Sequence, residues 1–324
     1  MMGGKAIMGK VWQNPRADEK SKIVIGLCTF NRHGPLKEAL DSLSRISLPP
    51  GVDVEFVLID NDANGGAKYI FDAYVPEIPF LSHYFVEKNR GLANVRNRVL
   101  QEALALNATE IAMFDDDEIV SDTWLVELHK AFKQADADGA YGTVYRALPL
   151  HSPKILKKFW QGRKRLAENS IHMLGTNNCL FSVDLVRPGG KNIRFNEMFN
   201  FSGREDVVFF FDAQLKGATF CRAPEAIVIE KFSEERSTFK YLFRRWFEAG
   251  LSDVALVKYY KFGGITRTLK EVFFTIPFGF LIMPFSILCG FHRFLRIALG
   301  ITSSFGWLCG LFGKTANYYL AHTD

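Results

Sequence analysis

The stretch that decides the fold is Glu110-Ile-Ala-Met-Phe-Asp-Asp-Asp-Glu118, an apolar run that ends in three aspartates. Short apolar runs of this kind are typical of strands buried on both faces of a parallel sheet. In an extended segment Asp115 and Asp117 point to one side, while Asp116 points to the other. Crowded carboxylates need a compensating cation or strong donors, and paired carboxylates bind Mg²⁺ or Mn²⁺. The stretch therefore predicts a metal site, with a solvated acidic turn as the alternative.

Segments before this stretch predict the rest of a sheet. Lys22–Phe30, Val54–Asp60 and Ser82–Glu87 are rich in β-branched and apolar residues. Helical segments from Pro35 to about Ile46 and from about Leu92 to Leu106 alternate with them. Ser121 is expected to cap a further helix that contains Trp124, and Gly217 is expected to end a helix that begins near Glu205. This alternation predicts an α/β fold with a mostly parallel sheet flanked by helices.

Polar residues follow each predicted strand. Because the carboxyl ends of parallel strands share one edge, and ligands of open α/β sheets bind there, these residues predict a binding crevice. The segment from Cys28 to Gly34 lacks the glycine spacing of a dinucleotide or Walker-type site, which argues against those ligand classes. The polar residues at this edge are Thr29, Asn31 and Arg32, then Asp60, Asn61 and Asp62, then Glu87, Lys88 and Asn89, and finally Asp115, Asp116 and Asp117.

Five motifs occur in a fixed order along the chain: Thr29–Arg32, Val57–Asp62, Asn89–Asn97, Phe114–Glu118 and Arg204–Asp206. This ordered set resembles family 2 glycosyltransferases with the Rossmann-like GT-A fold, especially bacterial enzymes that build surface polysaccharides. The resemblance covers roughly residues 22–250 and implies a hexosyltransferase-type enzyme. Its donor is expected to be a nucleotide-sugar, a UDP-sugar above all, and its acceptor a lipid-linked glycan or polysaccharide.

The same resemblance implies roles for the residues that bind the donor. Thr29, Asn31 and Arg32 are expected beside the nucleotide and Asp60 at the base. Thr29 and Arg32 could instead only shape the turn after the first strand.

Further residues are expected around the donor sugar and the metal. Asp115 is expected near the ribose and donor sugar, and Asp117, together with Asp115, at Mn²⁺ or Mg²⁺. Arg96 is expected close to the donor site, with pairing to surface acids as the alternative. Asn177 lies in a loop, residues 175–178, expected beneath donor sugar and acceptor, although an ordinary polar turn would have the same composition.

Glu205 and Asp206 match the acidic pair whose aspartate is the general base in inverting members of the family. A carboxylate in the first turn of a helix is held in place and kept ionised by the helix N-terminus, ready to accept a hydroxyl proton. An acid that only caps the helix would have the same position in the sequence. The predicted reaction is a single displacement with Asp206 as base.

Two departures from the family pattern limit the resemblance. Ile227–Lys231 lacks the late histidine that serves many members as a metal ligand, so the third protein ligand stays open. Leu242–Trp246 lacks the glutamine of processive synthases, which favours addition of a single sugar. The alternatives to a glycosyltransferase are a sugar nucleotidyltransferase and an inactive membrane-anchored nucleotide-sugar binding protein.

Composition bounds the partners. The net charge of +5, from 40 basic and 35 acidic residues, is too small to indicate nucleic acid. The 5 cysteines lack zinc-ligand spacing. Residues 1–20 lack the apolar run of a signal peptide and are expected to form a flexible tail, which leaves a catalytic domain over 21–250 in the cytoplasm.

Residues 251–324 predict a hydrophobic, membrane-associated helical tail. Segments 272–290 and 297–313 are uncharged and near the lower length limit for crossing a bilayer. An interfacial or re-entrant hairpin, a two-span anchor and a soluble partner-binding helix pair all fit. A basic stretch at 154–165 could face solvent, anionic lipid or an acidic acceptor. The enzyme is expected at the cytoplasmic face of the cell membrane.

Overall fold

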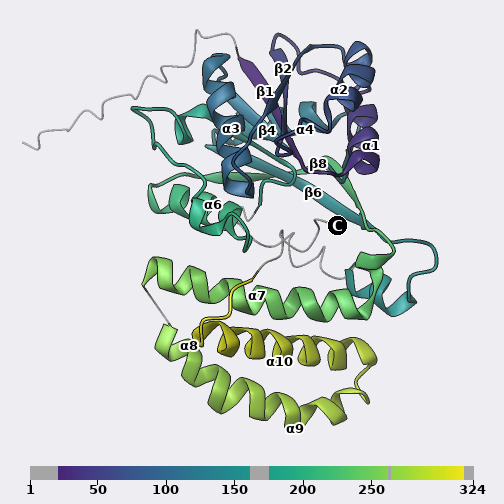
Figure 1. Cartoon of the computed structure of the whole chain (residues 1–324), viewed down its shortest axis with the longest axis vertical. Helices are drawn as coiled ribbons and strands as arrows, with labels where there is room; N and C mark the ends of the chain where they lie inside the picture. Colours follow the sequence, from purple (N-terminus) through teal and green to yellow (C-terminus); the bar gives the residue numbers. More distant parts are fainter. Residues whose placement is uncertain (1–20, 161–174, 262–263, 317–324) are drawn as a thin grey trace, which may run out of the picture.

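The structure is a computed structural model that describes residues 21–160, 175–261 and 264–316. A mixed α/β body forms its upper part in Figure 1, and a stack of helices lies beneath it. The tail 1–20 and the basic residues after position 160 lie outside the described residues.

The described residues form one eight-stranded sheet in the order β3-β2-β1-β4-β7-β6-β8-β5. Strands β3, β2, β1 and β4 are mutually parallel. Strand β7 is antiparallel to both β4 and β6, β6 pairs parallel with β8, and β5 pairs antiparallel with β8. The strands are β1 Lys22–Thr29, β2 Asp53–Asp60, β3 Leu81–Val86, β4 Glu110–Met113, β5 Glu118–Val120, β6 Gly139–Ala147, β7 Cys179–Ser182 and β8 Phe220–Lys231.

The four predicted parallel strands are confirmed as β1 to β4, and the mostly parallel α/β architecture is confirmed with them. Strand β6 was not predicted, because Gly139 and Gly142 weaken its strand pattern. Gly142 has a structural reason: a Cβ there would lie 2.2 Å from the Ala226 carbonyl oxygen. The β6–β8 pairing also shifts register between Tyr141 and Thr143.

Helices cover both faces of the sheet, as Figure 1 shows. Ile23 and Ile25 of β1 face a core shared with the first, second and fourth helices, whereas Val24 faces the core of the third and sixth. Gly26 allows the third helix to approach, since a Cβ there would meet Val99 at 2.2 Å. These helices are α1 His33–Leu43, α2 Lys68–Tyr74, α3 Leu92–Ala105, α4 Trp124–Ala135 and α6 Glu205–Leu215.

The ends of two helices test expectations from the sequence. Ser121 was expected to cap α4, but the capping position is Thr123, and Ser121 contributes its backbone carbonyl to Trp124 N–H at 2.9 Å. The Ser121 prediction is wrong because a turn separates that residue from the helix. Gly217 ends α6 as expected, with a φ of 78° that favours glycine.

The C-terminal part is helical. Two helices, Thr266–Ser286 and Phe291–Leu311, are long and apolar enough to cross a membrane. The domain boundary at residue 250 stays a prediction, although α7 runs through it without a break. The elements are α7 Phe239–Tyr260, α8 Gly264–Lys270, a π-helical turn Glu271–Thr275, α9 Ile276–Ser286 and α10 Phe291–Leu311.

Candidate active site

The predicted acidic cluster lies where β4 ends, and Asp116 points toward β1. The expected alternation of the three side chains is wrong, because Asp116 and Asp117 lie in a turn and both contact Arg32 Nη1. The Asp116 carboxylate is buried and accepts hydrogen bonds from Thr29 Oγ1 at 2.8 Å and from Arg32 Nη1 at 3.0 Å. Thr29 and Arg32 therefore hold the cluster against the end of β1. Their expected contact with a nucleotide stays a prediction, as does that of Asn31, which has a left-handed φ of 52° before α1.

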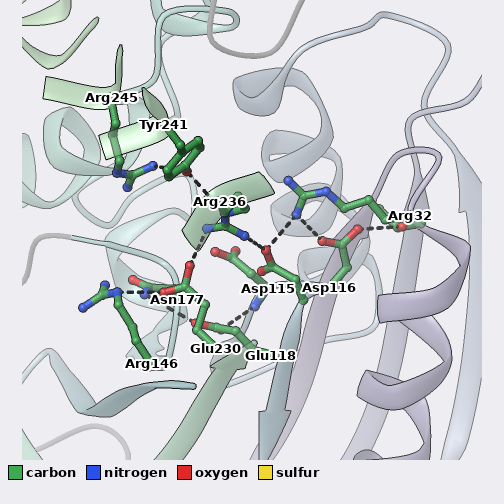
Figure 2. A network of polar contacts seen from close by, with 12 residues as sticks. Arg32, Asp115, Asp116, Glu118, Arg146, Asn177, Glu230, Arg236, Tyr241 and Arg245 are labelled. Carbon is green, nitrogen blue, oxygen red and sulfur yellow. Dashed lines mark hydrogen bonds and ion pairs between the residues drawn. The ribbon is translucent and has the colours of Figure 1, made fainter. Parts of the chain in front are cut away.

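The predicted metal ligand Asp117 lies between two guanidinium groups. Its Oδ2 is 3.2 Å from Arg32 Nη1 and 2.5 Å from Arg236 Nη1. Arg236 also donates from Nη2 to Glu230 at 2.6 Å, as Figure 2 shows. One side chain therefore joins Asp117 to the end of β8. In this structure the positive charges next to Asp117 are therefore the guanidinium groups of Arg32 and Arg236.

Arg96 of α3 connects the acidic cluster to the start of α6. It forms a buried ion pair with Glu205, and its Nη2 lies 3.5 Å from Asp115 Oδ1. Arg96 therefore pairs with acids of the site and not with the surface acids considered as an alternative. Burial raises the pKa of Glu205 to about 7, although Arg96 opposes that shift. Within the described chain, Glu205 Oε2 has no hydrogen-bond partner.

Asp206 lies in the first turn of α6, beside the loop that begins at Gly175. Its Oδ1 accepts a hydrogen bond from Val207 N–H at 2.7 Å. A Cβ built on Gly175 would lie 3.2 Å from the other carboxylate oxygen, so the loop passes directly against Asp206. Asn177 of the same loop points at Glu118 Oε1, 3.5 Å away. The structure thereby brings α6, this loop and the β4 acids together.

Asp60 is fully buried at the end of β2. Its carboxylate accepts hydrogen bonds from the backbone N–H of Asp62 at 2.9 Å and of Ala67 at 2.8 Å, and from Tyr84 OH at 2.7 Å. These contacts organise the loop between β2 and α2. The expected contact of Asp60 with a nucleotide base stays a prediction.

Two site acids had no role assigned from the sequence. Glu118 is buried and accepts a hydrogen bond from Asp115 N–H at 2.8 Å. Burial, with the nearby Asp115 and Glu230 carboxylates, raises the pKa of Glu118 well above its usual range. Glu230 accepts from Arg146 Nε at 2.9 Å and from Arg236. Glu118 ends the aspartate motif and Glu230 lies where a histidine was sought, so both were visible but not interpreted.

The residues around Asp115 and Asp117 can be tested as ligands for a divalent cation. Among the described residues no group of three or more His, Cys, Asp or Glu side chains is placed to hold a metal ion. Mg²⁺ in phosphate-binding sites commonly takes only one or two carboxylates and completes its shell with phosphate oxygens and water. Asp117 and Asp115 fit that pattern, provided that Asp117 exchanges its arginine partners for the ion.

The motifs and this geometry agree with a comparison across protein families. The profile of the family described as "Glycosyl transferase family 2" matches residues 24–199, more than half of the chain. The chain belongs to glycosyltransferase family 2.

Related proteins place this glycosyltransferase among known sequences and folds. It is 29% identical over 235 residues to the succinoglycan biosynthesis protein ExoM of Rhizobium meliloti, covering 72% of this chain and 74% of the relative. The solved structures of TarS residues 1–349 from S. aureus with UDP and with UDP-GlcNAc align with TM-scores of 0.51 and 0.52. Each is 15% identical and covers 90% of this chain and 92% of the other, so the likeness supports the GT-A-type fold.

Proposed function

We propose that this glycosyltransferase transfers a sugar from a UDP-sugar to a lipid-linked or polysaccharide acceptor during polysaccharide biosynthesis. The observation that carries the proposal is that Arg96 contacts both Asp115, after β4, and Glu205, at the start of α6, which places Asp206 close to the acidic cluster at the end of the parallel strands. The name of the ExoM relative supports a polysaccharide product, and the UDP and UDP-GlcNAc complexes of TarS support the donor class.

Asp206 is assigned the role of general base. Its carboxylate lies in the first turn of α6, where Oδ1 accepts a hydrogen bond from Val207 N–H. It takes the proton from the acceptor hydroxyl, and that oxygen forms a bond to the anomeric carbon as the bond from this carbon to the diphosphate oxygen breaks. The nucleoside diphosphate leaves, and attack opposite to it inverts the anomeric centre. Glu205, paired with Arg96, positions the start of α6 beside the acceptor.

Asp117 and Asp115 would hold Mn²⁺ or Mg²⁺. Such an ion, when bound, offsets the negative charge that grows on the leaving diphosphate. Arg32 and Arg236, which now contact Asp117, would then lie next to that diphosphate and bind its oxygens. Arg96 keeps Asp115 oriented toward the donor.

The place of action follows from the C-terminal helices. Their apolar surface supports attachment to a membrane, and a lipid-linked acceptor would be available there. We place the catalytic domain at the cytoplasmic face of the cell membrane, where UDP-sugars are available. The absence of the processive glutamine supports addition of one sugar per encounter.

The test is a donor screen with the purified full chain. UDP-sugars are incubated with Mn²⁺, with and without EDTA, and release of UDP is measured, followed by NMR of the product anomer. Metal-dependent UDP release from one UDP-sugar, with inversion, is expected. Release of pyrophosphate would indicate a nucleotidyltransferase instead. Donor binding without any release, across donors and acceptors, would indicate a binding protein.

A further inference from the structure

The helix α10 lies along α7 at very short range. A Cβ on Gly306 would be 2.0 Å from the Phe247 carbonyl oxygen, and one on Gly250 would be 2.0 Å from the Ser303 carbonyl oxygen. Only glycines allow the two backbones to touch in this way. Further toward the C-terminus of both helices, a Cβ on Gly310 would lie 2.8 Å from the Val254 side chain. The two helices therefore run side by side, as Figure 1 shows.

The helix α7 is in turn fixed to the catalytic domain. Ser252 Oγ donates to the Ser202 carbonyl oxygen at 2.7 Å, and Asp253 pairs with Arg204 at 2.9 Å. Near the end of α7, Tyr260 OH donates to Asp212 of α6 at 2.8 Å. In Figure 1, α7 crosses the base of the catalytic domain, and α10 and α9 follow as further layers. The orientation of α10 is thus tied to that of the whole domain.

This arrangement conflicts with a membrane-spanning α10. A span perpendicular to the bilayer would carry α7 into the hydrocarbon beside it. The helix α7 bears several charged residues, and each charge at the bilayer centre costs roughly 2.5–3.5 kcal/mol on insertion scales, so the total would be on the order of 10 kcal/mol. The charged residues of α7 are Lys240, Arg244, Arg245, Glu248, Asp253 and Lys258.

The outermost helix presents an apolar surface. Only 6% of the most apolar window in Thr266–Ser286 is buried, against 39% in α10. Phe278 is 61% exposed, Phe285 66% and Leu288 87%. We call this surface the α9 apolar face; its other exposed members are Phe273, Phe274, Phe280 and Leu281.

Basic residues flank the α9 apolar face along the chain. Residues 251–316 contain only two acids, Asp253 and Glu271, and both lie within ion-pair distance of Arg267. Lys261, Arg267 and Lys270 precede α9, and Arg293 and Arg296 lie in the first two turns of α10. An apolar face flanked by basic residues matches the chemistry of an anionic lipid surface.

We propose that the α9 apolar face lies flat in the surface of an anionic bilayer, with α10 held between α9 and α7, and that neither helix crosses the membrane. The inference rests on the membrane association proposed above and specifies its geometry. Arg236, just before α7, contacts Asp117, so the catalytic acids lie on the side of the domain that faces the helical layer. A lipid-linked acceptor in that bilayer would reach the site without leaving the surface.

The first test is binding of the purified full chain to preformed vesicles of phosphatidylcholine with a quarter phosphatidylglycerol. Co-sedimentation of the unmodified protein is expected, with at least tenfold weaker binding when Phe278→Asp and Phe285→Asp are combined. The matched control is Leu215→Asp at the end of α6, because Leu215 is equally exposed, at 65%, but lies in the catalytic domain. Unchanged binding of the double variant, or no binding of the unmodified chain, would overturn the proposal.

The second test separates a flat hairpin from a two-span anchor in bacterial cells. In a Cys289→Ser background, Arg293→Cys reports on the link before α10, and Lys258→Cys reports on the side of the catalytic domain. A membrane-impermeant maleimide is expected to label both in inverted vesicles and neither from outside spheroplasts. Labelling of Arg293→Cys from outside would show two spans. UDP release is assayed separately in detergent, so inactivity with the expected labelling would contradict only the proposed function.

Discussion

The Arg236 guanidinium lies against the Asp117 carboxylate, with 2.5 Å between Nη1 and Oδ2, and its second nitrogen contacts Glu230 at 2.6 Å. Arg236 precedes α7, whereas Asp117 follows β4, so this contact connects the helical layer to the predicted cation site. Because the proposed divalent cation would need the carboxylate that Arg236 contacts, we expect the cation and the Arg236 guanidinium to compete for Asp117.

Removing Arg236 should therefore strengthen metal binding. For Arg236→Ala, we expect Mn²⁺ to bind about tenfold more tightly in the absence of donor, since roughly 1.4 kcal/mol of competing interaction is lost. Titration of free Mn²⁺ by electron paramagnetic resonance measures this. The control is Arg146→Ala, because Arg146 contacts Glu230 without contacting Asp117 in any described ion pair. Equal affinity in Arg236→Ala and the unmodified enzyme would contradict the competition.

Asp206→Asn should separate binding from turnover. A neutral amide cannot accept the acceptor proton, and loss of a general base typically lowers the rate by about 10²–10⁴-fold. We expect kcat to fall within that range while the Kd of the UDP-sugar, measured by calorimetry, changes less than about twofold. The exposed acid Glu225 provides the control, since Glu225→Gln should change neither quantity. Near-normal kcat in Asp206→Asn would remove the residue from this role.

The buried Glu205 should make stability depend on pH. Its pKa rises from the ordinary value of 4.5 to about 7 on folding, so the folded protein binds more protons than the unfolded chain between these limits. The free energy of unfolding should consequently decrease as pH rises through this window, by up to about 1.4 kcal/mol per pH unit, and level off above it. The free energy of unfolding, measured with urea at pH 5, 6, 7 and 8, should depend less steeply on pH for Glu205→Gln than for the unmodified protein. An identical slope in the variant would refute the assignment.

Two glycines of α10 offer a matched test of its packing on α7. Gly306→Ala places a Cβ against the Phe247 backbone at 2.0 Å, and such overpacking typically costs about 1–3 kcal/mol. Gly300 has no atom within 4 Å of the same position, so Gly300→Ala should be neutral or stabilising, by up to about 1 kcal/mol from helix propensity. In thermal unfolding experiments, Gly306→Ala should therefore have a lower Tm than the unmodified protein, whereas Gly300→Ala should not. Equal Tm values would mean that the helices do not pack as described.

Much of the site's framework could be predicted from local sequence. Apolar runs mark β1 to β4, and polar residues at their ends mark the binding edge, because strand periodicity and strand termination depend on neighbouring residues. The alternation expected for Asp115, Asp116 and Asp117 was wrong, because the strand ends before them and a turn brings Asp116 and Asp117 to the same Arg32 nitrogen.

Other parts depended on contacts between distant segments. Arg96 pairs with Glu205, and Arg236 pairs with Asp117, across more than a hundred positions of sequence. A pattern of neighbouring residues cannot predict which of such distant side chains will meet. Ser121 was misassigned as a cap because a turn and a capping position look alike in sequence.

The sequence by itself determined a family 2 glycosyltransferase fold with its acids at one sheet edge, since those features follow from periodicity and ordered motifs. Only the tertiary structure decided which cations surround Asp117 and which face of the C-terminal helices stays apolar and exposed. Hydropathy is the same for a helix in lipid and a helix against protein. The contacts of Gly250 and Gly306 distinguish them, because they place α10 along α7 and leave α9 outermost.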